Sequence, residues 1–108
     1  MKGQNIFEIQ AELCRAMGSP LRMKIVHLLR AGPLNVNDIA IAMQSPQASI
    51  SRNLAILRNA GIVTAHREGT NAIYQVANPK ILSVCDMMRE VLSEQIEEQT
   101  KLMEQNSE

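Results

Sequence analysis

The alternation of apolar and polar positions predicts five helices and one β-hairpin along this chain. In the first stretch, residues 4–17, apolar side chains recur every three or four residues, which is the spacing of an amphipathic helix. Gly18 should end that helix, because glycine readily adopts the left-handed conformation found after a last helical turn. Ser19 and Pro20 should then open a second helix, which the pattern carries through Ala31.

A break at the sequence GPLN is followed by two more predicted helices. Asn35 should cap the third helix, because asparagine side chains accept hydrogen bonds from the first free N–H groups of a helix. A short turn follows, and Ser45 and Pro46 should open the fourth helix in the way predicted for the second. This fourth helix, with the sequence QASISRNLAILRNA, is expected to run to Ala60 and to stop at Gly61.

Residues 62–76 predict a β-hairpin, and a long helix is expected after it. The β-rich runs IVTAHR and AIYQVA flank the sequence EGTN, which offers a glycine for the turn. Asn78 and Pro79 should begin the last helix, which is expected over residues 79–104. At 1.5 Å per residue this helix would be roughly 39 Å long, more than the rest of so small a body could cover.

This order of elements predicts a mainly α fold with a β-hairpin wing, the winged helix-turn-helix. Residues 35–60 would form the helix-turn-helix and residues 62–76 the wing, within a single domain over residues 1–108. Apolar residues make up 45% of the chain, which indicates a globular protein. Phe7 and Tyr74 are the only aromatic residues, so a platform for stacking single-stranded bases is not expected. The sequence has no signal-peptide pattern, and a cytoplasmic protein is expected.

The formal net charge of zero conceals an uneven distribution of charge along the chain. Between Arg15 and Lys80 there are eight lysines and arginines against two acidic residues. From Asp86 to the C-terminus there are seven acidic residues against two basic ones. The basic middle of the chain suits an anionic partner. The alternative is that the acidic last helix is merely a solvated face.

The fourth predicted helix has one apolar side and one side of small and polar residues. On a helical wheel, Ile50, Leu54 and Leu57 share the apolar side. In a helix-turn-helix, the N-terminal part of the second helix enters the major groove of DNA. There Gln can pair with adenine, Arg with guanine, and Ser with a base or a phosphate. The candidate DNA contacts on this helix are Gln47, Ala48, Ser49, Ser51, Arg52 and Asn53.

The tip of the predicted hairpin offers further candidates for contact with double-stranded DNA. Arg67, Thr70 and Asn71 lie there, where basic and amide side chains could reach the minor groove or the phosphate backbone. The alternative is that the fourth helix presents an ordinary solvated face, since Ser, Gln and Arg are common on such faces.

Two segments resemble the ArsR/SmtB family of transcriptional repressors. The sequence ELCRAMGSPLRMKIVHLL is similar to the opening of that family, and SPQASISRNLAILRNAGIVTAHREGTNAIYQV to its recognition helix and wing. Together they cover about residues 11–77. The resemblance implies a homodimer that forms through the first and last helices, residues 4–17 and 79–104. It also implies a repressor that leaves its operator when an inducer binds.

The chain departs from the family at three places. Asn53 stands where the recognition helix of the family often has histidine, which predicts a changed base preference without loss of binding. Metal-sensing members carry a Cys-x-Cys sequence near the third helix, where this chain has NVNDIAIAM. Others carry Asp and His ligands on the last helix, where this chain has no histidine. Neither metal site can be transferred to this chain, and no cofactor is expected.

Cys14 and Cys85 remain as candidates for sensing an inducer. If the first and last helices pack together at a dimer interface, the two thiols could approach each other. They could then respond to an oxidant, reactive sulfur or a thiophilic metalloid by changing the interface. The alternative is that both are small buried hydrophobic residues, a common role of free cysteine.

These observations predict a homodimeric repressor that binds a pseudo-palindromic operator. An enzyme is not expected, because the sequence contains no defensible nucleophilic triad, carboxylate pair or glycine-rich phosphate loop. Two alternatives remain open, namely a winged-helix module that binds proteins, and a constitutive DNA-binding regulator without an inducer. Steep weakening with salt would distinguish DNA binding from a mostly apolar protein contact.

Overall fold

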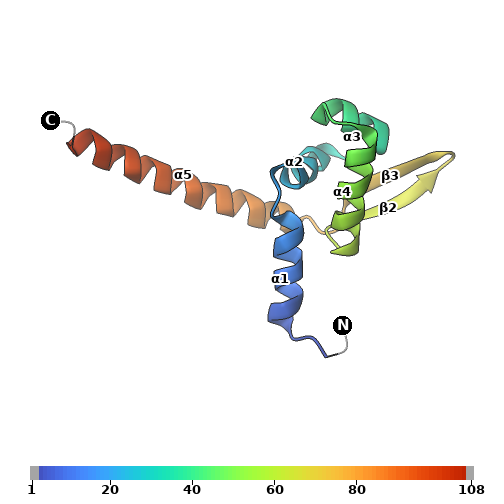
Figure 1. Cartoon of the computed structure of the whole chain (residues 1–108), viewed down its shortest axis with the longest axis horizontal. Coiled ribbons are helices and arrows are strands. Elements are labelled where there is room, and N and C mark those ends of the chain that lie inside the picture. Colours follow the sequence, from blue (N-terminus) through green and yellow to red (C-terminus); the bar gives the residue numbers. More distant parts are fainter. Residues whose placement is uncertain (1–2, 107–108) are drawn as a thin grey trace.

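The computed structural model describes residues 3–106 of the predicted domain, and residues 1–2 and 107–108 lie outside the described residues. The mainly helical winged helix-turn-helix fold predicted from the sequence is confirmed (Figure 1). Helices α3 (Val36–Met43) and α4 (Gln47–Asn59) form the helix-turn-helix, and strands β2 (Val63–Glu68) and β3 (Asn71–Val76) form the wing. The elements in chain order are α1 (Ile6–Met17), α2 (Pro20–Leu28), the 3-10 turn η1 (Leu29–Ala31), β1 (Leu34–Asn35), α3 (Val36–Met43), α4 (Gln47–Asn59), β2 (Val63–Glu68), β3 (Asn71–Val76) and α5 (Lys80–Asn106).

Three helices begin at a side chain that caps their first turn. The side-chain oxygens of Asn5, Ser19 and Asn35 accept a backbone N–H hydrogen bond from three residues further on, at 2.9, 3.3 and 2.8 Å. Such caps satisfy N–H groups that have no partner within the helix. The predicted caps Ser19 and Asn35 are confirmed. The first helix begins after the Asn5 cap, two residues later than predicted.

The predicted start of α4 is wrong in one respect, because Ser45 does not cap this helix. Pro46 occupies the cap position and no side chain caps the first turn. The Ser45 hydroxyl instead donates to the Met43 carbonyl at 3.1 Å. The preceding residue, Gln44, has a left-handed backbone with φ of 51°, and this turns the chain between α3 and α4. The first N–H groups of α4 therefore have no side-chain partner.

The wing belongs to a three-stranded antiparallel sheet in the order β1-β3-β2. Strands β2 and β3 pair from Val63 opposite Val76 to Glu68 opposite Asn71, so the turn between them is two residues long. Gly69 has a φ of +61° in this turn, which a residue without a side chain adopts at little cost. The short strand β1, which the sequence did not predict, pairs with β3 beside the hairpin.

The hydrophobic core lies between the helix-turn-helix, α2 and the base of the wing. The predicted apolar side of α4 is confirmed, since Ile50, Leu54 and Leu57 are completely buried. Their burial fixes which side of α4 faces outward. The other buried residues of this core are Ala16, Ile25, Val26, Leu29, Ile39, Ala40, Ile62 and Val63.

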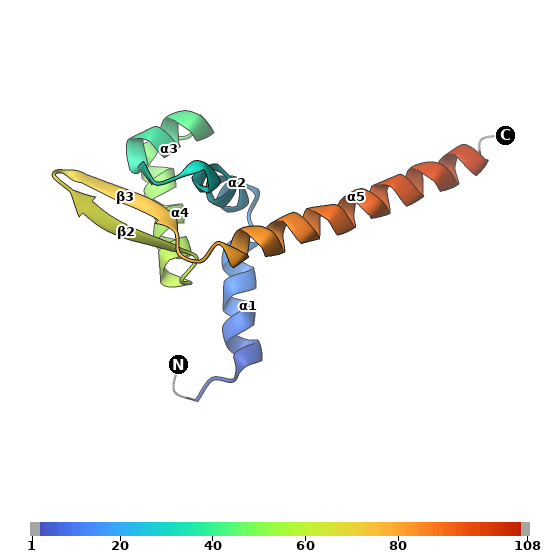
Figure 2. The same cartoon turned by 180° about the vertical axis from the view of Figure 1, so that it is seen from behind.

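Helix α5 projects from this body on the side opposite the wing, as both views show (Figures 1 and 2). None of its 27 residues is buried. The radius of gyration is 17.3 Å, whereas a compact chain of this length would have about 13 Å. The described chain is elongated because α5 extends away from the body instead of packing along it. Among the described residues, no helix combines the length and the apolar character needed to cross a membrane.

Candidate nucleic-acid interface

The outward face of α4 carries the residues that the sequence nominated for DNA contact. Gln47, Ala48, Ser51 and Arg52 are exposed in the first two turns, and Ser49 on the flank is half-buried. Helix α4 lies beside the wing, so the two elements can approach one ligand together (Figure 1). Within residues 3–106, Arg52 makes no hydrogen bond or ion pair. Its guanidinium is available to an external acceptor.

Asn53 lies differently from the other nominated residues of α4. It is half-buried, and its side-chain amide donates to the Ser49 carbonyl at 2.8 Å. Its Oδ1 atom accepts a hydrogen bond from Nη1 of Arg22 at 3.1 Å. Asn53 thus bonds α2 through its Oδ1 atom and its own helix through Nδ2, so both ends of the amide have partners within the protein.

Arg22 is a positioning residue that the sequence analysis did not identify. Besides Asn53, its guanidinium donates to the Ala16 carbonyl from Nε at 2.5 Å and to the Arg15 carbonyl from Nη2 at 3.4 Å. These carbonyls lie in the last turn of α1, where carbonyl groups have no N–H partner further along the helix, although that of Arg15 also accepts from the Gly18 N–H. Arg22 therefore connects α1, α2 and α4. Its position directly after the Ser-Pro-Leu start of α2 is the sequence signal that could have indicated this role.

The wing presents its three nominated residues at its free end. Arg67, Thr70 and Asn71 are all exposed, with Thr70 in the two-residue turn. His66 and Glu68 contact each other at 3.2 Å on the other face of β2, since alternate side chains of a strand point to opposite faces. The nearest carboxylate on the strand is therefore directed away from Arg67.

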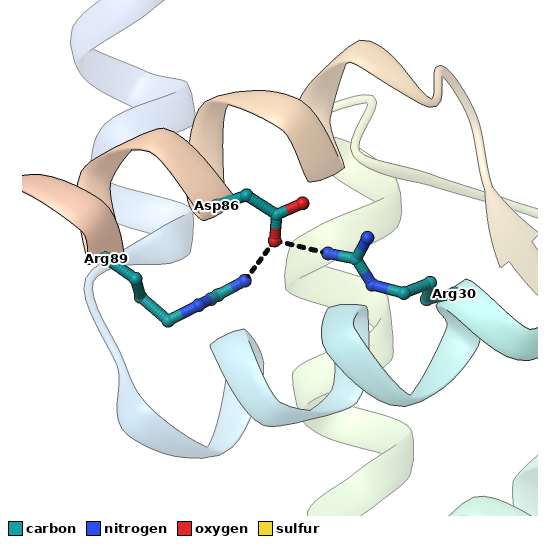
Figure 3. A network of polar contacts seen from close by, with 3 residues as sticks. All are labelled: Arg30, Asp86 and Arg89. Atoms are coloured by element: carbon teal, nitrogen blue, oxygen red, sulfur yellow. Dashed lines mark hydrogen bonds and ion pairs between the residues drawn. The ribbon is translucent and has the colours of Figure 1, made fainter.

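A shared carboxylate joins the base of α5 to the body (Figure 3). One oxygen of Asp86 accepts hydrogen bonds from Nη2 of Arg30, in the 3-10 turn η1, and from Nη2 of Arg89, both at 2.5 Å. Arg30 is the main reason why the pKa of Asp86 lies below its ordinary value of 3.8, with a further contribution from Arg89. The three side chains are 40 to 47% exposed, so water weakens these ion pairs. This contact joins residues 56 apart in the chain, and no pattern in the sequence predicts it.

The two cysteines are free thiols in the described chain. Cys14 is exposed on α1, which does not fit the alternative of a buried hydrophobic residue in the single chain. Cys85 is half-buried and borders a narrow hollow together with Met23, Val26 and His27 of α2. Across residues 3–106, no three His, Cys, Asp or Glu side chains gather in a way that could hold a metal ion.

Helices α1 and α5 expose apolar side chains to water. On α1, Ile6 is 68% and Phe7 is 76% exposed. On α5, an open apolar groove is bordered by Val84, Met87, Met88 and Val91, together with Ser83. Contiguous apolar surface of this kind is typical of a protein–protein interface.

Comparison with known proteins agrees with this geometry. Residues 19–65, which include the helix-turn-helix, match the sequence profile of a family described as bacterial regulatory protein, arsR family. The transcriptional repressor PagR of Bacillus anthracis is 31% identical over 78% of this chain and 85% of its own length.

Two solved structures are similar over nearly the whole chain. The crystal structure of Rv0081 from Mycobacterium tuberculosis, an HTH-type transcriptional regulator, has a TM-score of 0.81 at 26% identity and covers 91% of this chain and 99% of that chain. The solution structure of Mb0332 from Mycobacterium bovis is described as a homodimeric winged helix-turn-helix DNA-binding domain. It has a TM-score of 0.78 at 29% identity and covers 91% of this chain and 95% of that chain.

Proposed function

Because this chain belongs to the arsR family of bacterial regulatory proteins and is a DNA-binding transcriptional regulator, we propose that it is a homodimeric repressor of a pseudo-palindromic operator. The observation that carries the proposal is the exposed polar start of α4 beside the wing, opposite the buried Ile50, Leu54 and Leu57. A helix held in this way can enter the major groove while the wing contacts the adjacent backbone.

Base recognition is assigned to the first two turns of α4. Gln47 and Arg52 supply the bidentate groups that suit adenine and guanine, and Ser49 and Ser51 can bind a base or a phosphate. Ala48 allows close approach and can contact a thymine methyl group. The uncapped N–H groups at the start of α4 favour a nearby phosphate.

The wing and Asn53 have supporting roles in this proposal. Arg67, Thr70 and Asn71 bind the backbone or the minor groove and set the register of the protein on DNA. Asn53 acts mainly by holding α4 against Arg22, because both ends of its side chain are engaged within the protein.

The proposed dimer forms through α1 and α5. Both helices expose large apolar side chains, and no residue of α5 is buried in the single chain. An isolated helix gains little stability in water without packing of its apolar face. The similar domain of Mb0332 is described as homodimeric. Two copies of α4 would then bind half-sites about 34–36 Å apart, one turn of DNA.

The proposed release from DNA involves an inducer, and thiol chemistry at Cys14 and Cys85 is the first route to test. These cysteines lie on the two proposed dimerisation helices, and Cys14 is exposed. Oxidation by one hydrogen peroxide would convert two thiols to a disulfide and release two water molecules. A new covalent bond at the interface would change the separation of the two α4 helices. Reactive sulfur and thiophilic metalloids are the other candidate inducers, and a constitutive regulator without an inducer is the alternative.

The experiment that tests the proposal is the selection of binding sites from random duplexes with the purified protein, both reduced and mildly oxidised. An enriched pseudo-palindrome is expected, with affinity that falls steeply as salt rises. Loss of the enriched site on oxidation, but not in Cys14→Ser, would support thiol release, and an unchanged site would contradict it. If no sequence were enriched in either state, the repressor proposal would be wrong and a protein-binding module would be favoured.

A further inference from the structure

A groove lies between the last turns of α4 and one face of the wing. It is bordered by Arg58 from α4 and by side chains from both strands of the hairpin. In the strand register Ala65 is opposite Tyr74 and Arg67 is opposite Ala72, so these four side chains share a face of the sheet. The two alanines leave room between the arginines. The residues that border this α4–wing groove are Arg58, Ala65, His66, Arg67, Ala72 and Tyr74.

The charge in the α4–wing groove is positive. Arg58 and Arg67 are both exposed, and no carboxylate borders the groove. Within the described part of the chain, neither arginine has an ion-pair partner. Glu68, the nearest acidic residue along β2, does not border the groove, and its carboxylate contacts His66 at 3.2 Å. Two uncompensated guanidinium groups on facing elements form a receptor for an anion, because guanidinium binds phosphate oxygens with paired N–H donors.

The α4–wing groove opens beside the face of α4 that is assigned to base recognition. Arg58 follows Ser51 by seven residues and Gln47 by eleven, spacings that place the three residues along one side of the helix. This side borders the buried side of α4, since the buried Leu54 follows Gln47 by seven residues, and all three of its side chains are exposed. An anion in the groove would therefore lie next to a nucleic acid bound along α4. Arg58 lies in the last turns of α4, outside the first turns in which the sequence predicts base contacts.

We propose that Arg58 and Arg67 form a phosphate clamp that binds the backbone of double-stranded DNA between the recognition helix and the wing. This inference rests on the proposed function and adds a site to it. The clamp binds a phosphodiester group from two sides, so it fixes the position of the wing relative to α4 on the duplex. Because every nucleotide carries the same phosphate, the clamp strengthens binding without selecting a sequence.

The test measures the salt dependence of DNA binding for Arg58→Gln, Arg67→Gln and the matched control Lys101→Gln, which removes a charge from α5 far from the wing. The logarithm of the affinity falls with the logarithm of the salt concentration, and each lost phosphate contact should reduce that slope by about one. The two arginine variants should lose the same factor in affinity on the selected operator and on an unrelated duplex. Lys101→Gln should keep the slope, and Arg58→Lys should restore most of it.

Two results would overturn the clamp. One is an unchanged slope in a folded Arg58→Gln protein, and the other is a loss restricted to the selected operator, which would indicate base recognition by Arg58. If the wild-type protein bound no duplex in a salt-dependent way, the proposed function itself would fail. A steep wild-type slope with an unchanged Arg58→Gln slope would instead remove the clamp alone.

A second measurement uses only the wild-type protein and Arg58→Lys, so it does not depend on the folding of Arg58→Gln. Single phosphates of the duplex are replaced by neutral methylphosphonates, one position at a time. The clamp predicts one or two positions per half-site, outside the selected bases, at which neutralisation weakens binding for both proteins. Equal binding at every neutralised position near the wing would contradict the clamp.

Discussion

Arg22 donates a hydrogen bond from Nη1 to Oδ1 of Asn53 across 3.1 Å, which joins α2 to α4 over 31 residues of sequence. The same guanidinium donates to the Ala16 carbonyl at the end of α1. The orientation of the recognition helix therefore depends on a polar contact as well as on its buried apolar side. Asn53, which the sequence predicts as a DNA contact, has hydrogen-bond partners within the protein at both ends of its side-chain amide.

Replacement of Asn53 by alanine should weaken binding of every DNA sequence by a similar factor. The change removes the Arg22 contact, so α4 is held less firmly, and a loss of stability of about 1 kcal/mol is expected in urea unfolding. Asn59→Ala, on the exposed end of the same helix, is the control and should change stability little. Relaxed preference at a single base position would show instead that Asn53 contacts DNA directly.

Replacement of Arg52 by alanine should change the sequence preference of DNA binding, unlike replacement of Asn53. If Arg52 pairs with a guanine edge, the variant should lose about 1–3 kcal/mol of binding free energy and accept other bases at one operator position. Competition binding with operators changed at one base pair at a time provides the measurement. An equal loss on all these sequences would assign Arg52 to a phosphate.

The Asp86 network should make the attachment of α5 dependent on pH. Because Arg30 lowers the pKa of the folded carboxyl below 3.8, folding favours the ionised form. Its contribution to stability is fully present above pH 3.8 and is lost as the pH falls through the lower folded pKa. Wild type should therefore be more stable than Asp86→Asn at pH 7, and the difference should shrink in acid. A pH-independent difference in urea unfolding would contradict this linkage, and Glu94→Gln should show no comparable difference.

A charge on the apolar groove of α5 should separate the proposed dimer. Val91 is 47% exposed in the single chain, and Val91→Glu would place a carboxylate in the interface, where burial of an unpaired charge is costly. Sedimentation should show monomers, and operator affinity should fall because only one half-site is bound at a time. Ser93→Glu adds the same charge to the other side of the helix and should remain dimeric. A dimeric Val91→Glu protein would place the interface elsewhere.

Local signals made most of the fold predictable from sequence. Ser19 and Asn35 are caps, and the hairpin is bounded by residues that favour strands and a glycine turn. The two-residue strand β1 could not be predicted, because its pairing with β3 depends on tertiary contact and it is too short to show a period. Ser45 resembled Ser19 in sequence, but the left-handed Gln44 directs its hydroxyl back to Met43.

The candidate site was less predictable than the fold. The helical wheel separated the buried and exposed sides of α4 correctly. It could not show that Asn53 has a partner from another helix, or that Arg58 faces the wing across a groove. Both relationships join segments that are brought together only by folding, and a single sequence carries no periodic signal for such contacts.

Helix α5 also has a mechanical consequence. From Met87 onward every described residue of this helix is exposed, so only its first turns rest on the body. The part of α5 beyond Asp86 is roughly 30 Å long, and a rotation of about 10° at Asp86 would move its far end by about 5 Å. If a second copy is bound along α5, a rotation of the helix about Asp86 would move that copy relative to the first. A small change in the contacts of Asp86 with Arg30 and Arg89 would then change the separation of the two α4 helices, which would no longer match one turn of DNA.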